Sequence, residues 1–118
     1  MTILLLDPDQ YYQHQFQEHL GGNFNILTAP DTRTAEDLLI SAAPDIVVGE
    51  LMLADGPSYE FLEKTRRLQN SLPIIIFSQI NTLPDIEAAL ALGVSGYFVK
   101  GQDSVNDVRK LLLTLNPT

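Results

Sequence analysis

The chain has 118 residues, of which 45% are apolar, 8% aromatic and 19% charged, a balance typical of one compact folded domain. Fifteen acidic and seven basic residues give a formal net charge of −8, which disfavours nucleic-acid binding because phosphate neutralisation requires clustered cations. The lack of cysteine excludes disulfides and thiolate zinc sites, and no apolar run approaches the ~20 residues of a membrane span. We expect one cytoplasmic domain over residues 1–118, with no membrane association.

Short apolar runs alternate along the chain with helically spaced apolar residues. The runs are too brief for helices and rich in β-branched or aromatic residues, which predicts strands at 3–6, 24–27, 46–48, 74–77 and 97–99. Apolar residues that recur every three or four positions predict helices over 12–20, 35–42, 61–68, 86–90 and 105–115. We expect Pro57 in the first turn of the third helix, a capping pair of Ser104 and Asp107 at the fifth, and Pro117 at its end.

The alternation of five strands with five helices predicts a doubly wound α/β fold. Crossovers between parallel strands are right-handed, so helices cover both faces of the sheet, and continuous apolar strands fit burial on both faces. In such sheets, ligands bind beyond the carboxyl ends of the strands. The residues expected at that edge are Asp7, Asp9, Glu50, Ser78 and Lys100.

These residue types favour a site for a cation or a phosphoryl group. Carboxylates bind hard metal ions, whereas ammonium and hydroxyl groups hold phosphate oxygens. A purely structural interpretation is also open. Asp7 and Asp9 can cap the first helix and supply its first-turn acid, and Lys100 can neutralise Glu50 at the end of a buried strand.

Four segments of the sequence resemble the receiver domain of two-component response regulators. They are 3–7, 44–55, 72–78 and 91–100, and the likeness spans all five strand and helix units. The resemblance implies a flavodoxin-like (βα)5 three-layer sandwich whose five parallel strands lie in the order 2-1-3-4-5. It also implies transfer of a phosphoryl group from a histidine kinase to an aspartate, beside magnesium held by an acid pair.

The sequence departs from this family at the residues that carry that chemistry. Glu50 stands where receivers have the acceptor aspartate, and its carboxylate is longer by about one C–C bond, ~1.5 Å. Pro8 follows Asp7 where receivers have a second acid, and Asp9 lies one position further on. Phosphoryl transfer depends on positioning and charge neutralisation, so we expect no catalytic residue. We expect at most weak magnesium binding, with Asp7, Asp9 and Glu50 as its only candidate ligands.

Two neighbouring positions also differ from the family. Gln79 replaces a small residue after Ser78, and we expect it to narrow the pocket that a phosphoryl group would enter. Gly101 replaces the proline that usually follows the lysine, which removes the chemical basis of the cis peptide common there.

Three residues of the family's switch are retained. By resemblance, Ser78 follows the phosphoryl group inward, Lys100 contacts that group, and Tyr97 moves between exposed and buried positions as the fourth helix, fifth strand and fifth helix rearrange. Structural roles are open for each of them. Ser78 can cap a turn, Tyr97 can be a fixed edge aromatic, and Lys100 can simply pair with Glu50.

The function expected is that of an atypical receiver-like signalling module that acts through protein–protein contacts, without phosphorylation and without catalysis. Its partner is expected to be a signalling protein, such as a histidine kinase or an output domain, bound at the fourth helix, fifth strand and fifth helix. The alternative is an active receiver that accepts a phosphoryl group in a magnesium-dependent way. A flavin-binding protein of similar topology is disfavoured because Asp7 and Asp9 would repel the flavin phosphate.

Overall fold

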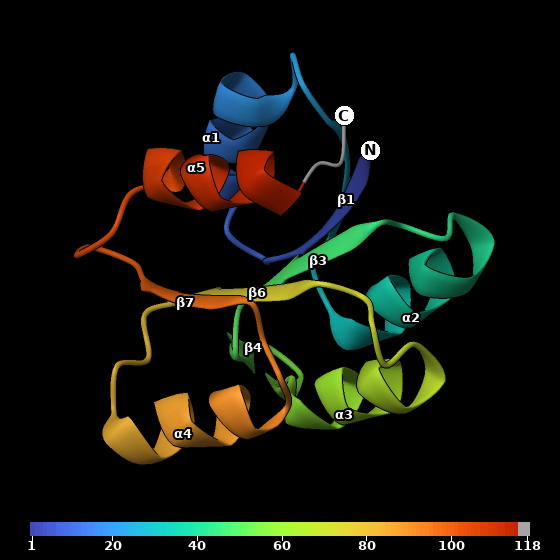
Figure 1. Ribbon diagram of the computed structural model, residues 1–118, viewed down its shortest axis with the longest axis vertical. Coiled ribbons are helices and arrows are strands. Elements are labelled where there is room, and N and C mark those ends of the chain that lie inside the picture. Colours follow the sequence, from blue (N-terminus) through green and yellow to red (C-terminus); the bar gives the residue numbers. More distant parts are fainter. Residues whose placement is uncertain (116–118) are drawn as a thin grey trace.

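A five-stranded parallel sheet forms the centre of the computed structural model, which describes residues 1–115 (Figure 1). The strands lie in the order β2-β1-β3-β6-β7, and every pairing is parallel. Numbered within the sheet alone, this is the predicted order 2-1-3-4-5, and the doubly wound, flavodoxin-like α/β fold is confirmed. The strands are β1 Thr2–Leu6, β2 Asn25–Ala29, β3 Ile46–Gly49, β6 Ile74–Ser78 and β7 Gly96–Val99.

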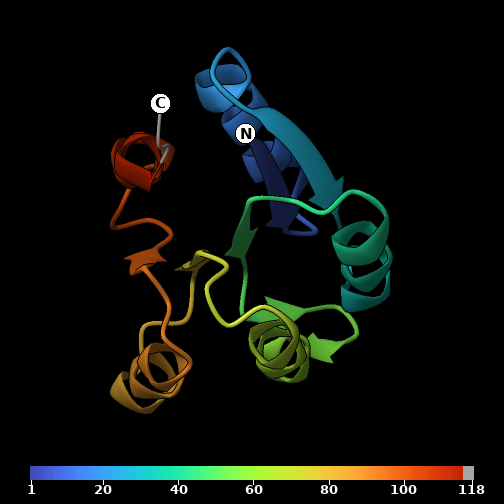
Figure 2. The ribbon, with the colours of Figure 1, turned by 45° about the vertical axis from the view of Figure 1, so that its right-hand side comes forward.

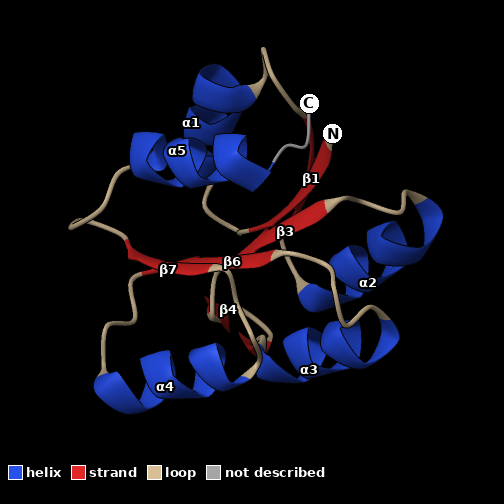
Figure 3. Ribbon diagram, viewed as in Figure 1, coloured by secondary structure: helices blue, strands red, loops and turns tan. Residues whose placement is uncertain are grey.

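Five helices cover the two faces of this sheet, with α1 and α5 on one face and α2, α3 and α4 on the other (Figures 1 and 3). Side chains of β1 alternate between the two layers: Ile3 and Leu5 pack with α1 and α5, and Leu4 and Leu6 pack with α2 to α4. None of the helices within residues 1–115 is both long and apolar enough to cross a membrane. The helices are α1 Gln10–Leu20, α2 Thr32–Ser41, α3 Tyr59–Leu68, α4 Leu83–Ala91 and α5 Val105–Leu115.

Polar side chains cap the helices where the local sequence favours it. Asp9 and Asp31 are the N-caps of α1 and α2, and each carboxylate accepts a hydrogen bond from a backbone N–H of the first turn. The capping pair before α5 is confirmed, because the amide of Ser104 donates to the Asp107 carboxylate at 2.8 Å and the amide of Asp107 donates to the Ser104 hydroxyl at 3.2 Å. Pro117, the expected end of this helix, lies outside the described residues.

The segment after β3 folds into a short antiparallel hairpin that we did not predict (Figure 2). Its strands are β4 Met52–Leu53 and β5 Gly56–Pro57. The expected place of Pro57 in the first turn of a helix is therefore wrong, since α3 begins only after Ser58. The buried hydroxyl of Ser58 donates to the carbonyl oxygen of Glu50 at 2.8 Å, which closes the hairpin before the helix begins. The hairpin thereby fixes the backbone that carries Glu50.

Candidate functional site

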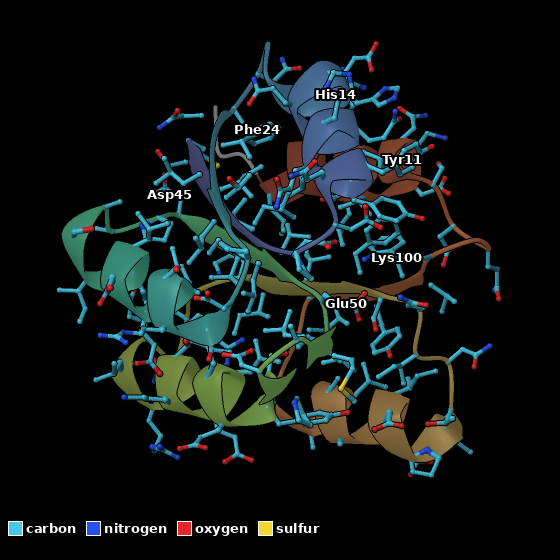
Figure 4. The ribbon with its side chains drawn as sticks, turned by 180° about the vertical axis from the view of Figure 1, so that it is seen from behind. Tyr11, His14, Phe24, Asp45, Glu50 and Lys100 are labelled. Atoms are coloured by element: carbon cyan, nitrogen blue, oxygen red, sulfur yellow. The ribbon has the colours of Figure 1, made fainter. Side chains whose placement is uncertain are left out.

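Four of the predicted site residues meet at the carboxyl edge of the sheet. Asp7 follows β1, Glu50 follows β3, Ser78 ends β6 and Lys100 follows β7. Asp7, Glu50 and Ser78 are buried, and the side chain of Lys100 is only 7% exposed. Figure 4 shows Glu50 and Lys100 close together at this edge. We refer to these four residues as the edge cluster.

The ammonium of Lys100 binds both carboxylates of the edge cluster. Its Nζ lies 2.8 Å from Asp7 Oδ2 and 2.8 Å from Glu50 Oε2. Burial alone lowers the pKa of Lys100, but its hydrogen bonds to Asp7 and Glu50 outweigh burial and raise that pKa above its usual value. At Asp7 burial dominates, so its pKa is raised even though Lys100 acts to lower it. The chain itself therefore supplies the cation that the two carboxylates require.

Both oxygens of the Glu50 carboxylate have partners within the chain. Oε1 accepts hydrogen bonds from the amides of Leu51 at 2.9 Å and Met52 at 3.3 Å, and also from the hydroxyl of Ser78. Oε2 faces the Lys100 ammonium and accepts no other bond among residues 1–115. The carboxylate is thus fixed by one charge and three donors. A buried carboxylate needs such partners, because an unpaired charge in a protein interior is costly.

The structure separates the two acids expected after the first strand. Asp7 enters the edge cluster, and its second oxygen, Oδ1, accepts a hydrogen bond from the amide of Asp9 at 2.9 Å. Asp9 is exposed and caps α1, where its carboxylate accepts a hydrogen bond from the amide of Tyr11 at 2.9 Å. Asp9 is therefore the N-cap of α1, the role that the structural interpretation gave to Asp7, and no acid occupies the first turn of this helix. Asp7 lies in the edge cluster instead.

The donor set of the edge cluster is poorly suited to a resident magnesium ion, which prefers carboxylate and water oxygens in an octahedral arrangement. One oxygen of Asp7 and one of Glu50 already bind the Lys100 ammonium, and Pro8 contributes no carboxylate. Within residues 1–115, no group of three or more His, Cys, Asp or Glu side chains is placed to hold a metal ion. A magnesium ion at this edge would compete with Lys100 for both carboxylates.

Ser78 connects the edge cluster to the loop after β6. Its hydroxyl donates to Glu50 and accepts a hydrogen bond from the amide of Ile80 at 3.0 Å, so Ser78 both caps this turn and contacts Glu50. The phenol of Tyr97 donates to the carbonyl oxygen of Ile80, and its half-buried ring packs against the layer of α2 to α4. Burial raises the pKa of Tyr97, and the charges of Asp85 and Glu50 raise it further. A chain of contacts thus joins Glu50 to Tyr97.

Gln79 and Gly101 are the two further positions at which the sequence differs from the family. Gln79 is exposed to solvent, and its effect on the space beside Ser78 stays a prediction. Gly101 has φ of +86°, a left-handed backbone conformation that glycine adopts readily, and no cis peptide bond occurs among residues 1–115.

Sequence reasoning missed one side chain that contacts the site. The Lys100 Nζ lies 4.4 Å from the centroid of the Tyr12 ring, which in turn packs edge-on against Phe77 at a centroid separation of 5.3 Å. Tyr12 belongs to the apolar stripe of α1, and only the topology that brings α1 over β6 reveals its contact with the ammonium. The ring packs against the ammonium of Lys100 and contributes to its burial.

Comparisons with known proteins agree on one family. Residues 3–112 match the family described as the response regulator receiver domain. The chain is 28% identical to the response regulator MprA of Mycolicibacterium vanbaalenii, matching 85% of this chain and 44% of that protein. It is 31% identical to a probable transcriptional regulator, ycf27, of Galdieria sulphuraria, matching 83% of this chain and 38% of that protein. The chain thus spans less than half the length of these curated relatives.

Solved structures share the fold. The non-phosphorylated HemR receiver domain from Leptospira biflexa superposes with a TM-score of 0.89 at 21% identity, covering 99% of this chain and 94% of that one. The BeF3-activated receiver domain of Klebsiella pneumoniae RstA gives 0.84 at 20% identity, covering 98% and 99%. Non-phosphorylated and activated receivers are thus both similar to the chain in fold.

Proposed function

Because the chain belongs to the response regulator receiver domain family, we propose that it is an atypical, non-enzymatic receiver whose contact surface is held in one conformation by Glu50 without phosphorylation. Receiver domains are signalling modules that interact with kinases or output domains. In this proposal the encoded carboxylate of Glu50 takes the part that a phosphoryl group on an aspartate plays in active receivers.

The observation that carries the proposal is that both oxygens of the Glu50 carboxylate are engaged within the chain. Ser78 and Lys100, which in the family contact the phosphoryl group, both bind Glu50 instead. A nucleophile must have an unoccupied oxygen aimed at the incoming phosphorus, and catalysis of phosphoryl transfer depends on that placement. The oxygens of Glu50 are held by one ammonium, one hydroxyl and two amides.

The proposed output runs through Tyr97 to the surface made of α4, β7 and α5. The contact of Ser78 with Glu50 holds the loop whose Ile80 carbonyl accepts the Tyr97 hydrogen bond, and the Tyr97 ring packs inward. Leu83 and Leu90 on α4 are exposed and provide apolar contact area beside it. We propose this surface as the site where a signalling partner, a histidine kinase or an output domain, binds.

One observation favours the alternative of an active phosphotransfer receiver. Asp7, Ser78 and Lys100 are retained and lie together, so three parts of the family's machinery are in place. That function requires Glu50 to leave Lys100 and Ser78, and magnesium to bind between Asp7 and Glu50.

Phosphorylation with a small-molecule donor separates these two functions. The chain is incubated with acetyl phosphate and magnesium and followed by intact mass, and in parallel with beryllofluoride and magnesium, followed by backbone amide shifts. We expect no added mass and no shift changes at Glu50, Ser78 or Lys100. The matched control is the double variant Pro8→Asp, Glu50→Asp, which restores the acid pair and the shorter acceptor. A stoichiometric mass increase of the unmodified chain would establish the alternative.

A further inference from the structure

A shallow groove between α2 and α3 carries the two most exposed large apolar side chains found among residues 1–115. Ile40 is 81% exposed and Leu68 is 67% exposed, and both line this groove. Its floor is the buried pair Leu39 and Phe61, and its rim carries Glu36 and Lys64. These six residues define the α2–α3 groove, which lies on the opposite side of the sheet from α1 and α5 (Figure 1).

The size of the groove indicates what kind of molecule fits it. Its volume is about 50 Å³, whereas pockets for small-molecule ligands range from about 300 to 1,000 Å³. A single apolar side chain fits such a space. Exposed apolar side chains beside a groove of this size are typical of a protein–protein contact and not of a ligand site.

The balance of acidic and basic residues around the groove favours a second copy of this chain as the partner. Lys64 Nζ lies 3.7 Å from Glu36 Oε2, so the acid and the base on the rim lie at the same position along the two helices. α2 and α3 together carry four of the seven basic residues of the chain and four of its fifteen acids. They are therefore neutral as a pair, although the whole chain has a net charge of −8. Two copies repel each other least where their facing surfaces carry no net charge.

The spacing of the groove residues fits a two-fold axis. Ile40 follows Glu36 by one helical turn on α2, and Leu68 follows Lys64 by one turn on α3. The two helices follow parallel strands and lie next to each other, running in the same general direction (Figure 1). A two-fold axis parallel to both helices places α2 of one copy opposite α3 of the other. Such a rotation leaves the position of every residue along the axis unchanged. Each Glu36 then faces Lys64 of the other copy, and each Ile40 faces Leu68.

We propose that the α2–α3 groove is the contact surface of a symmetric dimer of this chain. The contact consists of two apolar pairs and two exposed ion pairs, which is small for a protein interface. We expect weak association, with a dissociation constant of roughly 100 µM. This contact is separate from the α4, β7 and α5 surface and from the edge cluster, so it does not depend on the proposed function.

Sedimentation velocity of the 118-residue chain from about 10 µM to 1 mM tests the dimer. We expect the unmodified chain to change from monomer to dimer over this range. Leu68→Glu and Ile40→Glu each act twice in a symmetric contact and should weaken association by more than about tenfold. The matched control is Tyr11→Glu on α1, at a residue that is 63% exposed and lies on the other face of the sheet, and it should leave association unchanged.

A charge exchange tests the pairing itself. Glu36→Lys alone and Lys64→Glu alone each place like charges opposite one another and should weaken association about tenfold, whereas the double variant should restore it. Circular dichroism of every variant checks that the fold is retained, as expected for exposed positions. A chain that stays monomeric at 1 mM would overturn the proposal and leave the groove to a partner of different sequence. So would a dimer that Leu68→Glu leaves intact or that the Tyr11→Glu control abolishes.

Discussion

The phenol of Tyr97 donates a hydrogen bond to the carbonyl oxygen of Ile80, two residues beyond the serine that contacts Glu50. The aromatic ring and the carboxylate are therefore joined through one short loop. Since the amide of Ile80 also donates to the Ser78 hydroxyl, the loop is fixed through both the N–H and the carbonyl group of Ile80. A change at Glu50 can therefore reach Tyr97 by moving this loop.

Glu50→Gln keeps the shape of the side chain and removes its charge, so it isolates the electrostatic part of this coupling. We expect altered amide shifts at Ser78, Ile80 and Tyr97 and in residues 85–92, because the Lys100 ammonium loses one of its two carboxylates. Glu87→Gln on the exposed surface of α4 is the matched control and should change only its neighbours. Unchanged shifts at Tyr97 together with unchanged partner affinity would mean that packing alone fixes the surface.

Lys100→Met should lower the free energy of unfolding by ~1–3 kcal/mol, because it leaves two buried carboxylates without their cation. Methionine retains much of the apolar stem, so lost packing contributes little. The control is Lys110→Met on the exposed surface of α5, expected to stay within about 0.5 kcal/mol of the parent. Urea denaturation measures both changes. Equal stability of the Lys100→Met variant and the parent would show that water, and not the ammonium, stabilises the carboxylates.

Arg66→Met should destabilise the chain by ~1–3 kcal/mol through the loss of charge-assisted hydrogen bonds. The Arg66 guanidinium donates to the carbonyl oxygens of Leu92 at 2.8 Å and Gly93 at 3.2 Å, after α4, and of Leu72 at 2.7 Å, before β6. Hydrogen exchange should rise first at the end of α4. Arg67→Met, at the exposed neighbouring position, is the control, and the interpretation fails if the two variants lose equal stability.

Acid should remove the stabilising effect of the Asp31 cap. The amide and hydroxyl of Thr34 donate to the Asp31 carboxylate and hold its pKa below the usual value of 3.8. The folded chain therefore binds this proton less readily than the unfolded chain does. The stabilisation is complete above the usual pKa and is lost as the pH falls through the lower, folded value. Asp31→Asn keeps a capping oxygen that does not titrate.

Thermal unfolding of both proteins from about pH 5 to about pH 2.5 measures this difference. The parent should lose more stability on acidification than the Asp31→Asn variant, because only the parent protonates its cap. Parallel curves over the whole range would contradict the assignment of the cap. The exposed carboxylate of Asp37 further along α2 provides the control substitution, Asp37→Asn.

Much of the fold could be predicted from sequence because each core strand contains a continuous apolar run and each helix has apolar residues along one face. The boundaries are less well determined by the local pattern. The second strand starts at Asn25 and extends to Ala29, beyond the apolar run, because Thr28 and Ala29 pair with Leu5 and Leu6 of β1. That pairing is a property of the neighbouring strand and is invisible in the local pattern.

The site could be predicted as a set of positions but not as a network. Parallel topology alone predicts that residues after the strands share one edge, which places Asp7, Glu50, Ser78 and Lys100 near one another. The contacts that decide the chemistry are made in part by backbone amides of Leu51 and Met52. Backbone amides leave no trace in a sequence, and the hairpin that orients them contains Pro57, which a helical pattern tolerates equally well.

The hydrogen bond between Ser78 and Glu50 has a consequence for how such a module could carry information. A phosphoryl group is added and removed while the protein persists, so one molecule can report many successive events. A glutamate is built in at translation and cannot be erased. If the carboxylate determines the conformation of the contact surface, every newly made copy has the same conformation there. Only the number of copies can then vary. The rates of synthesis and degradation would then be the quantities through which a cell adjusts this signal.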